Sequence, residues 1–362
     1  MLGKLRSRTI AQLLKQYSQL IWSDPCLERL IPKQISSPAD LSHYTRQTPF
    51  TADLNSYTEG ICRPVWSMLE RRGKSWRGVL CLFTAQAFGG DLKQAIPLAI
   101  STELLHNASM MIDDVEDKSE VARGKPAVHM LFGPELTINA ACFLYFLAQL
   151  AVQETTLAWQ TKARLTEMYT RELLAMHLGQ CSDLQWSRVP GYVPTSQQFC
   201  QMAASKTGSV VRLALRYGAE AAKCEGKTIE KLMELGDNLG IAFQIHDDLL
   251  SLQVETYALN KKYLGEDITE GKRTLMALHA VQQSHRAKRL LELLDRKTND
   301  LVEVSEALSI MNESGSLEYA EKEGDRFAAK AVALLDETVP DSESKEHMRA
   351  LVHFLMQSKL SL

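Results

Sequence analysis

Apolar residues recur at every third or fourth position along almost the whole chain, which is the spacing of helices that bury one face. Runs of valine and isoleucine bounded by turn residues, which would indicate strands, are scarce. The pattern therefore predicts an all-α protein built as a single large helical bundle, with no segment suited to a sheet. We expect helices at residues 4–20, 54–71, 75–88, 91–117, 134–154, 158–186, 196–222, 226–252, 271–296, 301–311, 315–336 and 341–359.

Three segments interrupt this helical pattern. Residues 21–53 are polar and contain four prolines, which indicates an extension rather than a core helix. Residues 118–133 and 254–271 form two loops that are rich in charge and glycine. The pattern therefore predicts an N-terminal helix and polar extension over residues 1–53, followed by one helical domain over residues 54–362.

Composition limits the classes of ligand. Of the 362 residues 45% are hydrophobic, which is enough for a substantial core. The formal net charge of −3 offers no excess of positive charge to a nucleic acid, so a local group of Lys and Arg has to hold any anionic ligand. The most apolar run, residues 138–152, is shorter than the roughly 20 residues that cross a bilayer, so we expect no membrane span.

The cysteines and the N-terminus bear on the compartment. Seven cysteines, an odd number without a C-x-x-C pair, indicate thiols in a reducing compartment. The first 22 residues carry four basic side chains and no acidic one, which is typical of a plain basic helix or of an organellar targeting segment. We expect a cytoplasmic protein, with an organelle as the alternative.

The first chemically distinctive segment is acidic. Asp113-Asp114-Val115-Glu116-Asp117 follows directly on an apolar helical run. On a helix Asp113 and Asp117 lie one turn apart on one face, which His106 and Ser109 continue. Mg²⁺ in proteins takes one or two carboxylates together with substrate phosphates, so the segment is suited to a metal-bound phosphate. The alternative is a solvated acidic helix end.

A second acidic pair, Asp247 and Asp248, lies on another apolar helix and shares a face with Gln244 and Ser251. An isolated pair of this kind is usually a surface feature. Two such motifs in apolar helices are harder to explain in that way, because burying carboxylates without a cation is costly.

Basic and glycine-containing segments lie before, between and after these acidic helices. They are Gly73–Arg77, Ala122–Pro126, Ser205–Gly208 and Lys262–Lys272. Each alone is typical of a solvated loop. Their order around two acidic motifs predicts a site for a diphosphate.

Together these segments resemble the trans-isoprenyl diphosphate synthases of the polyprenyl synthetase family, over roughly residues 55–359. The two acidic motifs carry the resemblance, with support from Leu178–Leu184 and from Phe243-Gln244. The resemblance implies the isoprenoid synthase fold with a central apolar cavity, and a homodimer.

The resemblance also implies roles for individual residues. It implies magnesium, three ions in each active site, with the ligands Asp113, Asp117 and Asp247. Further catalytic residues would be Asp114, Asp248, Lys206 and Lys262, of which the two lysines, together with Thr207, grip the allylic diphosphate. The implied site for isopentenyl diphosphate consists of Gly73, Lys74, Arg77, His106 and Arg123. Further substrate-binding residues would be Thr207, Phe243, Gln244 and Lys272.

This chain departs from the family pattern at two positions. Ala122 stands where the family usually has the first of two arginines, and Ser251 ends the second motif in place of the commoner Asp or Asn. The first departure removes a cation on the allylic side. The second leaves Asp247, on which metal contact in the family chiefly rests.

The implied reaction condenses isopentenyl diphosphate with dimethylallyl, geranyl or farnesyl diphosphate. About one turn before Asp113 the helix presents Ala108 and Ser109, small residues that leave room for a growing chain. We therefore expect geranylgeranyl diphosphate or a longer product. The alternatives are a terpene cyclase that uses the same magnesium site, and a regulatory subunit of a heteromeric synthase.

Overall fold

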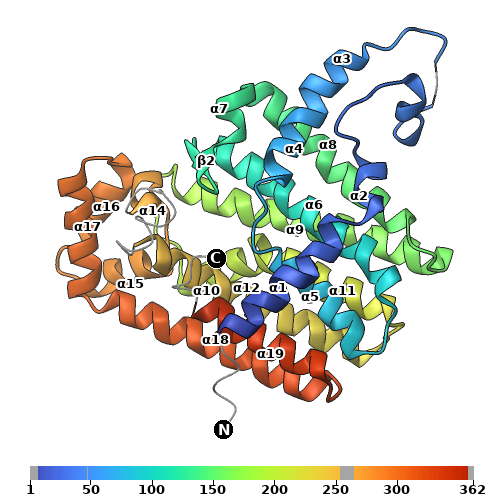
Figure 1. Cartoon of the computed structure of the whole chain (residues 1–362). Helices are drawn as coiled ribbons and strands as arrows, with labels where there is room; N and C mark the ends of the chain where they lie inside the picture. The colour runs from blue at the N-terminus through green and yellow to red at the C-terminus, as the bar shows by residue number, and fades with distance from the viewer. Residues whose placement is uncertain (1–6, 47, 253–264, 358–362) are drawn as a thin grey trace. The chain divides into compact units, whose positions relative to one another are not determined.

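The computed structural model describes residues 7–46, 48–252 and 265–357 (Figure 1), and its regular structure confirms the all-α class. The helices of the first half are α1 (Ser7–Trp22), α2 (Pro25–Leu30), α3 (Leu54–Tyr57), α4 (Arg63–Leu69), α5 (Trp76–Ala87), α6 (Leu92–Glu116), α7 (Val128–Phe132), α8 (Pro134–Gln153) and α9 (Trp159–Trp186). Those of the second half are α10 (Ser196–Lys206), α11 (Gly208–Ala221), α12 (Lys227–Ser251), α14 (Glu266–Glu270), α15 (Leu275–Gln283), α16 (Ala287–Arg296), α17 (Leu301–Glu313), α18 (Ser316–Thr338) and α19 (Glu343–Met356).

Three predicted helices are divided in the structure. Within residues 54–71 a π-helical turn, η2 (Thr58–Cys62), separates α3 from α4, because Pro64 has no N–H to continue the regular ladder. Thr207 separates α10 from α11 within the helix predicted over 196–222. Ser284 takes an extended conformation and separates α15 from α16.

The prediction that no sheet forms is wrong at one place. Strands β1 (Val121–Ala122) and β2 (Lys125–Pro126) pair antiparallel, with Ala122 opposite Lys125. The two residues between them have positive φ, 51° at Arg123 and 73° at Gly124, as in the type I′ turns that suit tight hairpins. Strands of two residues are too short for a period of two to be visible in the sequence.

The predicted polar extension also contains short helices. Helix α2 begins after Asp24, whose side chain accepts a hydrogen bond from the Cys26 N–H. A 3₁₀ helix, η1 (Pro38–His43), follows. Buried side chains of α2, such as Leu27 and Leu30, show that this segment packs on the fold.

The chain divides into two compact units, and each is described by itself. The α6 unit consists of Ala11–Glu167 and Tyr217–Lys223. In it α6 packs along both α5 and α8. Helix α8 is long and apolar enough to cross a membrane, but half of that window is buried within the fold, as in the core helix of a globular protein.

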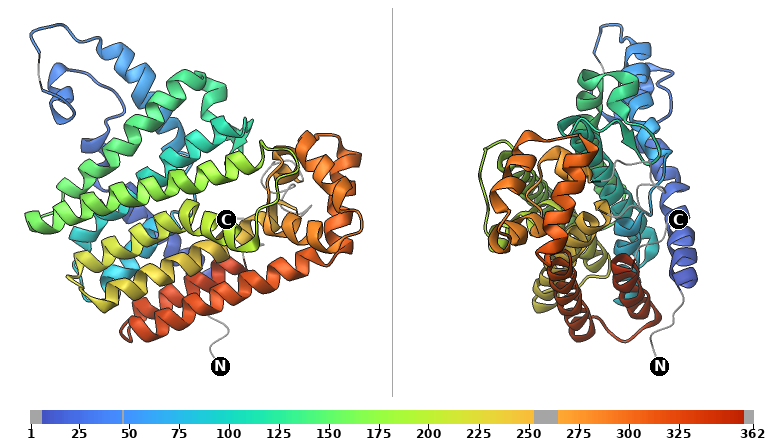
Figure 2. Two further views of the ribbon diagram at one scale, coloured as in Figure 1. Left: turned by 180° about the vertical axis from the view of Figure 1, so that it is seen from behind. Right: turned by 90° about the vertical axis from the view of Figure 1, so that its left-hand side faces the viewer.

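The α12 unit consists of Met1–Ile10, Met168–Arg216 and Cys224–Leu362. Its two long helices α12 and α18 lie side by side, as the views from the front and from behind both show (Figures 1 and 2). The buried Arg273 joins segments of this unit, because its guanidinium pairs with Asp295 and donates to the carbonyls of Tyr192 and Gly271.

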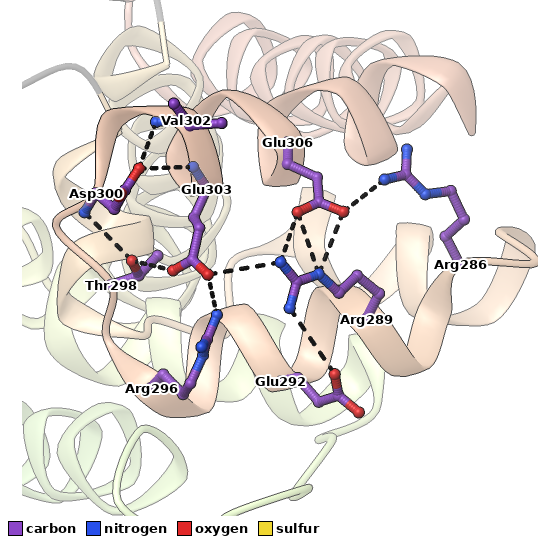
Figure 3. A network of polar contacts seen from close by, with 9 residues as sticks. All are labelled: Arg286, Arg289, Glu292, Arg296, Thr298, Asp300, Val302, Glu303 and Glu306. Atoms are coloured by element: carbon purple, nitrogen blue, oxygen red, sulfur yellow. Dashed lines mark hydrogen bonds and ion pairs between the residues drawn. The ribbon is translucent and has the colours of Figure 1, made fainter.

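An ion-pair network links α16 to α17 at the surface of the α12 unit (Figure 3). Arg289 donates to both carboxylate oxygens of Glu306, which also accepts from Arg286. Asp300 caps α17 by accepting from the N–H groups of Val302 and Glu303. We assign this network a structural role, since exposed ion pairs of this kind stabilise a fold only modestly.

Candidate active site

The first acidic motif lies at the C-terminal end of α6. Asp117 caps the helix, and its N–H donates to the Asp113 carbonyl at 2.9 Å. A helix C-terminus carries partial negative charge, so carboxylates there are unfavourable unless a cation is present. Asp114, in the same turn, is buried. The buried Tyr145 of α8 lies within electrostatic range of Asp113 and Glu116, and the sequence did not single it out.

Two turns before Asp113, α6 contacts the start of α5 through His106. Arg77 Nη1 lies 3.2 Å from His106 Nε2, and the guanidinium of Arg77 stacks on the Trp76 ring at 4.4 Å. Burial lowers the pKa of His106 well below its ordinary value, and the charges of Arg77 and Arg123 add to the shift. His106 is therefore neutral and accepts from Arg77, so the arginine keeps its charge for a ligand.

The β1–β2 turn carries Arg123 to the same place. Its Nη1 donates to Asn107 Oδ1 at 2.9 Å, and Asn107 Nδ2 is itself fixed by the Glu103 carbonyl at 2.7 Å. A Cβ on Gly73 would lie 3.2 Å from Cζ of Arg123, closer than most real Cβ contacts. Glycine at position 73 therefore leaves room for the Arg123 guanidinium.

A buried carboxylate completes this group. Glu103 accepts from the Gly78 N–H at 2.8 Å and lies within electrostatic range of Arg77 and Arg123. Burial raises the pKa of Glu103, while the Gly78 hydrogen bond and the two arginines oppose the shift. The sequence pattern did not identify Glu103 and Asn107, although their positions beside His106 on one helix could have indicated them.

Four of the five residues predicted to bind isopentenyl diphosphate lie close together in the structure, and the fifth, Lys74, follows one of them in the chain. The four are Gly73, Arg77, His106 and Arg123. Lys74, half-buried, lies in the turn before α5, where Ser75 has a φ of 49° and its Oγ accepts from Trp22 Nε1 at 2.7 Å. We name these five residues the cation cluster.

A second group of predicted residues comes together in the α12 unit. Lys206 Nζ lies 2.7 Å from Asp183 Oδ2, and the Thr207 hydroxyl donates to Gln244 Oε1. Gly179 allows α9 to lie close to the backbone of Lys206, because a Cβ at position 179 would lie 2.4 Å from the Lys206 backbone nitrogen. The break between α10 and α11 therefore contacts α9 through Gly179 and α12 through Gln244.

The second acidic motif continues that chain of contacts. Gln244 Nε2 donates to Asp248 Oδ1 at 2.7 Å. Burial raises the pKa of Asp248 well above its ordinary value, and the nearby carboxylates of Asp267, Asp247 and Asp183 raise it further. We name these four carboxylates, with Lys206, the acid cluster. Such an excess of carboxylates is the environment in which a divalent cation is stabilising.

The departure at the end of the second motif has a structural explanation. The Ser251 hydroxyl lies 2.6 Å from Asp267 Oδ2, so it fixes a carboxylate of the acid cluster. Lys272, another predicted site residue, lies 3.9 Å from Asp267 Oδ1 and pairs with Glu270.

The remaining predicted positions are as follows. Phe243 is half-buried on α12, Ala108 is fully buried on α6, and Ser109 is half-buried with its Oγ donating to the His106 carbonyl at 2.8 Å. Lys262 lies outside the described residues.

The donor set fits magnesium that shares its coordination with a ligand. Among residues 7–46, 48–252 and 265–357, no three His, Cys, Asp or Glu side chains form a ready-made metal site. The first motif contributes Asp113 and Asp117, and the second contributes Asp247 and Asp248, with Asp183 and Asp267 within electrostatic range of Asp248. Mg²⁺ is commonly bound in this way, by one or two carboxylates together with substrate phosphates.

Known proteins similar to this chain identify its family. The family model described as polyprenyl synthetase matches residues 58–311. A geranylgeranyl pyrophosphate synthase of Aspergillus fumigatus is 36% identical over 252 residues, which are 70% of this chain and 67% of that protein.

Two solved structures share the fold. The geranylgeranyl pyrophosphate synthetase of Pyrococcus horikoshii is 26% identical, with a TM-score of 0.83 over 97% of this chain and 99% of that chain. A geranylgeranyl pyrophosphate synthase of Corynebacterium glutamicum, complexed with isoprenyl diphosphate and magnesium, is 20% identical, with a TM-score of 0.78 over 98% of this chain and 100% of that chain. This chain belongs to the polyprenyl synthetase family, as its two aspartate-rich motifs predicted.

Proposed function

We propose that this chain is a trans-prenyltransferase that joins isopentenyl diphosphate to an allylic diphosphate. The product is a linear prenyl diphosphate of twenty carbons or more, with geranylgeranyl diphosphate as the main one. The cation cluster is the observation that carries the proposal, because it offers one diphosphate a site separate from the acidic motif on the same helix. The family and the names of its relatives support the same activity.

The cation cluster is suited to bind isopentenyl diphosphate without help from a metal. Arg77 donates to the neutral His106 and Arg123 donates to the neutral Asn107, while the Glu103 carboxylate lies within electrostatic range of both arginines. With Lys74 the cluster offers more positive than negative charge to a phosphate. Charge-assisted hydrogen bonds to phosphate oxygens are roughly twice as strong as neutral ones. A terpene cyclase ionises a single diphosphate and has no use for such a site.

The acid cluster and the first motif are each suited to hold magnesium beside a diphosphate, as the resemblance to the family implies for the allylic substrate. We propose that Asp113, Asp117 and Asp247 hold magnesium, in keeping with their position at a helix end and among other carboxylates. When bound, the metal supplies positive charge to the diphosphate group that leaves the allylic substrate. The ammonium group of Lys206 has three N–H donors, of which Asp183 takes one, so it can also donate to a diphosphate. Three ions per site remains our prediction.

The reaction then needs only binding and positioning from the protein. The allylic C1–O bond breaks, its electron pair leaves with the diphosphate, and the double bond of isopentenyl diphosphate attacks C1. The proton lost in the final step passes to the released diphosphate. Preorganised charge around the leaving group is the main catalytic contribution that these side chains make.

We also propose a homodimer. Helix α8 exposes apolar side chains that a monomer would leave in water, with Phe146 71% and Ile138 42% exposed. Phe146→Glu should convert the dimer to monomer in sedimentation velocity, and an unchanged sedimentation coefficient would place the interface elsewhere.

The activity is tested with radiolabelled isopentenyl diphosphate, magnesium and each of dimethylallyl, geranyl and farnesyl diphosphate. Linear products of twenty or more carbons are expected after dephosphorylation and chromatography. A cyclic hydrocarbon would support the cyclase instead. Activity only after a second subunit is added would support the regulatory alternative.

Product length is tested on α6. Ser109→Phe places a ring one turn before Asp113, where it should block the growing chain and shorten the product to fifteen carbons or fewer. If the wild-type chain already yields mainly farnesyl diphosphate, the steric argument is wrong.

A further inference from the structure

A basic pocket lies in the α6 unit, apart from the residues of the cation cluster. Its volume is about 420 Å³. It lies between α4, α7 and the β1–β2 hairpin, and its lining residues are Lys33, Arg63, Trp66, Ser67, Glu70, Arg71, Lys125, Pro126, Leu131 and Phe132. The lining thus contains four cationic side chains and one carboxylate.

One stripe of α4 forms a wall of the pocket. Arg63, Trp66 and Ser67 lie on one face of α4, at offsets of three and four residues, and the turn that ends the helix adds Glu70 and Arg71 to this wall. The opposite face is the buried one, as Val65 and Met68 show with no exposed surface. The cations are therefore presented by a helix that the core holds in place.

Arg71 is the buried anchor of the pocket, with 9% of its surface exposed. Its guanidinium donates to the Ser67 carbonyl at 2.8 Å, to the Ala122 carbonyl at 3.1 Å and to Ser67 Oγ at 3.2 Å. No carboxylate lies within ion-pair distance of it in the part of the chain that the structure describes. A guanidinium has five N–H donors, so these three contacts leave donors for an anion.

The hairpin adds a second cation beside Arg71. Lys125 is paired in register with Ala122, whose carbonyl Arg71 contacts. Lys125 is exposed, and no described carboxylate forms an ion pair with it. Arg71 is buried and has no described carboxylate within ion-pair distance, so a complementary anion between Arg71 and Lys125 would stabilise this arrangement.

The other two cations of the lining, Lys33 and Arg63, form only exposed ion pairs. Lys33 lies 2.6 Å from Glu70 and Arg63 lies 2.5 Å from Glu59, with all four side chains about half exposed. Exposed pairs of this kind are weak and can exchange partners for a ligand phosphate. Trp66, Leu131 and Phe132 provide an apolar edge beside them.

We propose that this pocket is a second anion site that binds a diphosphate group, separate from the two substrate positions. The proposal rests on the proposed function, because a prenyltransferase releases pyrophosphate and handles prenyl diphosphates. Arg71 also lies within electrostatic range of Asp114 and Arg123. An anion in the pocket therefore withdraws positive charge from the first motif, and we expect it to inhibit turnover.

Binding is tested by calorimetric titration of the full chain without magnesium, with inorganic pyrophosphate as the probe. Lys125→Glu reverses a charge on an exposed side chain and should weaken one binding event about tenfold or more. Lys93→Glu, an exposed lysine outside the pocket, is the matched control and should change nothing. Arg63→Glu gives a second pocket variant, and Lys74→Glu identifies binding at the cation cluster. Circular dichroism verifies the fold of each variant.

The outcomes separate the possible ligands. Tighter binding of geranylgeranyl thiolodiphosphate than of pyrophosphate, lost in Lys125→Glu, would show that the pocket takes a prenyl diphosphate. Equal affinities would show that free pyrophosphate suffices. If neither pocket variant differs from Lys93→Glu, or if Lys74→Glu removes all binding, the proposal is wrong. These titrations need no turnover, so a chain that formed no linear product would refute the proposed function without deciding this site.

Discussion

The cation cluster and the acid cluster are built on opposite principles. In the cation cluster Arg77 and Arg123 each contact a neutral partner, and the buried carboxylate of Glu103 lies beside both. The guanidinium groups are thus held in place before any ligand arrives, and together with Lys74 they outnumber the one carboxylate.

In the acid cluster the excess charge is negative. Asp248 is buried among the carboxylates of Asp183, Asp247 and Asp267, and Lys206 pairs with Asp183. Repulsion among these carboxylates persists until a cation or a proton relieves it. We infer from this difference that one diphosphate binds through protein cations alone, whereas the other requires a metal ion.

The largest effect should come from removing a carboxylate on the metal side. Asp113→Ala and Asp247→Ala should each lower kcat by about a thousandfold, because the charge that stabilises the leaving diphosphate is lost. Removal of magnesium with a chelator should have the same effect on the wild-type chain. Steady-state assays measure kcat, and Glu225→Ala, an exposed acid, is the control. More than a tenth of the wild-type activity in Asp113→Ala would contradict the assignment.

The next effect should fall on the cation cluster alone. Asn107→Ala removes the acceptor of Arg123, and loss of a hydrogen bond to a charged group costs about 1.5–3 kcal/mol. We expect the KM for isopentenyl diphosphate to rise about 10- to 100-fold, with the allylic KM unchanged.

Asn238→Ala is the matched control for that prediction. Asn238 makes the same helical contact as Asn107, with its Nδ2 donating to the carbonyl four residues earlier, but it is not beside Arg123. A parallel rise in both Michaelis constants of Asn107→Ala would show that the two clusters are not independent.

A smaller effect is expected at Gly73. In Gly73→Ala the new methyl group would lie 3.2 Å from the Arg123 guanidinium, which has to shift by a few tenths of an ångström. The KM for isopentenyl diphosphate should rise about threefold, since a fraction of the charged contact is lost. Gly60→Ala, where the nearest neighbour is a leucine methyl at 3.5 Å, should be neutral. The same KM for isopentenyl diphosphate in both variants would show that Gly73 is not needed to make room for the Arg123 guanidinium.

The smallest effect concerns pH. Because the pKa of His106 lies well below its ordinary value of 6.5, the folded chain binds fewer protons there than the unfolded chain as the pH falls below 6.5. The free energy of unfolding should therefore decrease as the pH falls through this range. His106→Gln should remove that part of the slope in urea unfolding, and His353→Gln, at an exposed ring, should not. The same slope in wild type and His106→Gln would mean that His106 is not held neutral.

The sequence by itself determined the helical class, the family and the two acidic motifs. Helical periodicity depends on nearest neighbours along one element, and Asp113 with Asp117 needs only the helical repeat to share a face. The segment from Gly73 to Arg77 was likewise identified by its residue types.

Only the tertiary structure decided which partners hold those residues. Asn107 of α6 meets Arg123 in the turn of a hairpin whose strands are two residues long, and Ser251 meets Asp267, which lies 16 residues further along the chain. The contact of Arg71 with the Ala122 carbonyl is invisible in the sequence, because any residue offers a carbonyl. Such contacts join common residue types from distant positions, so their identity depends on how the helices and the hairpin pack.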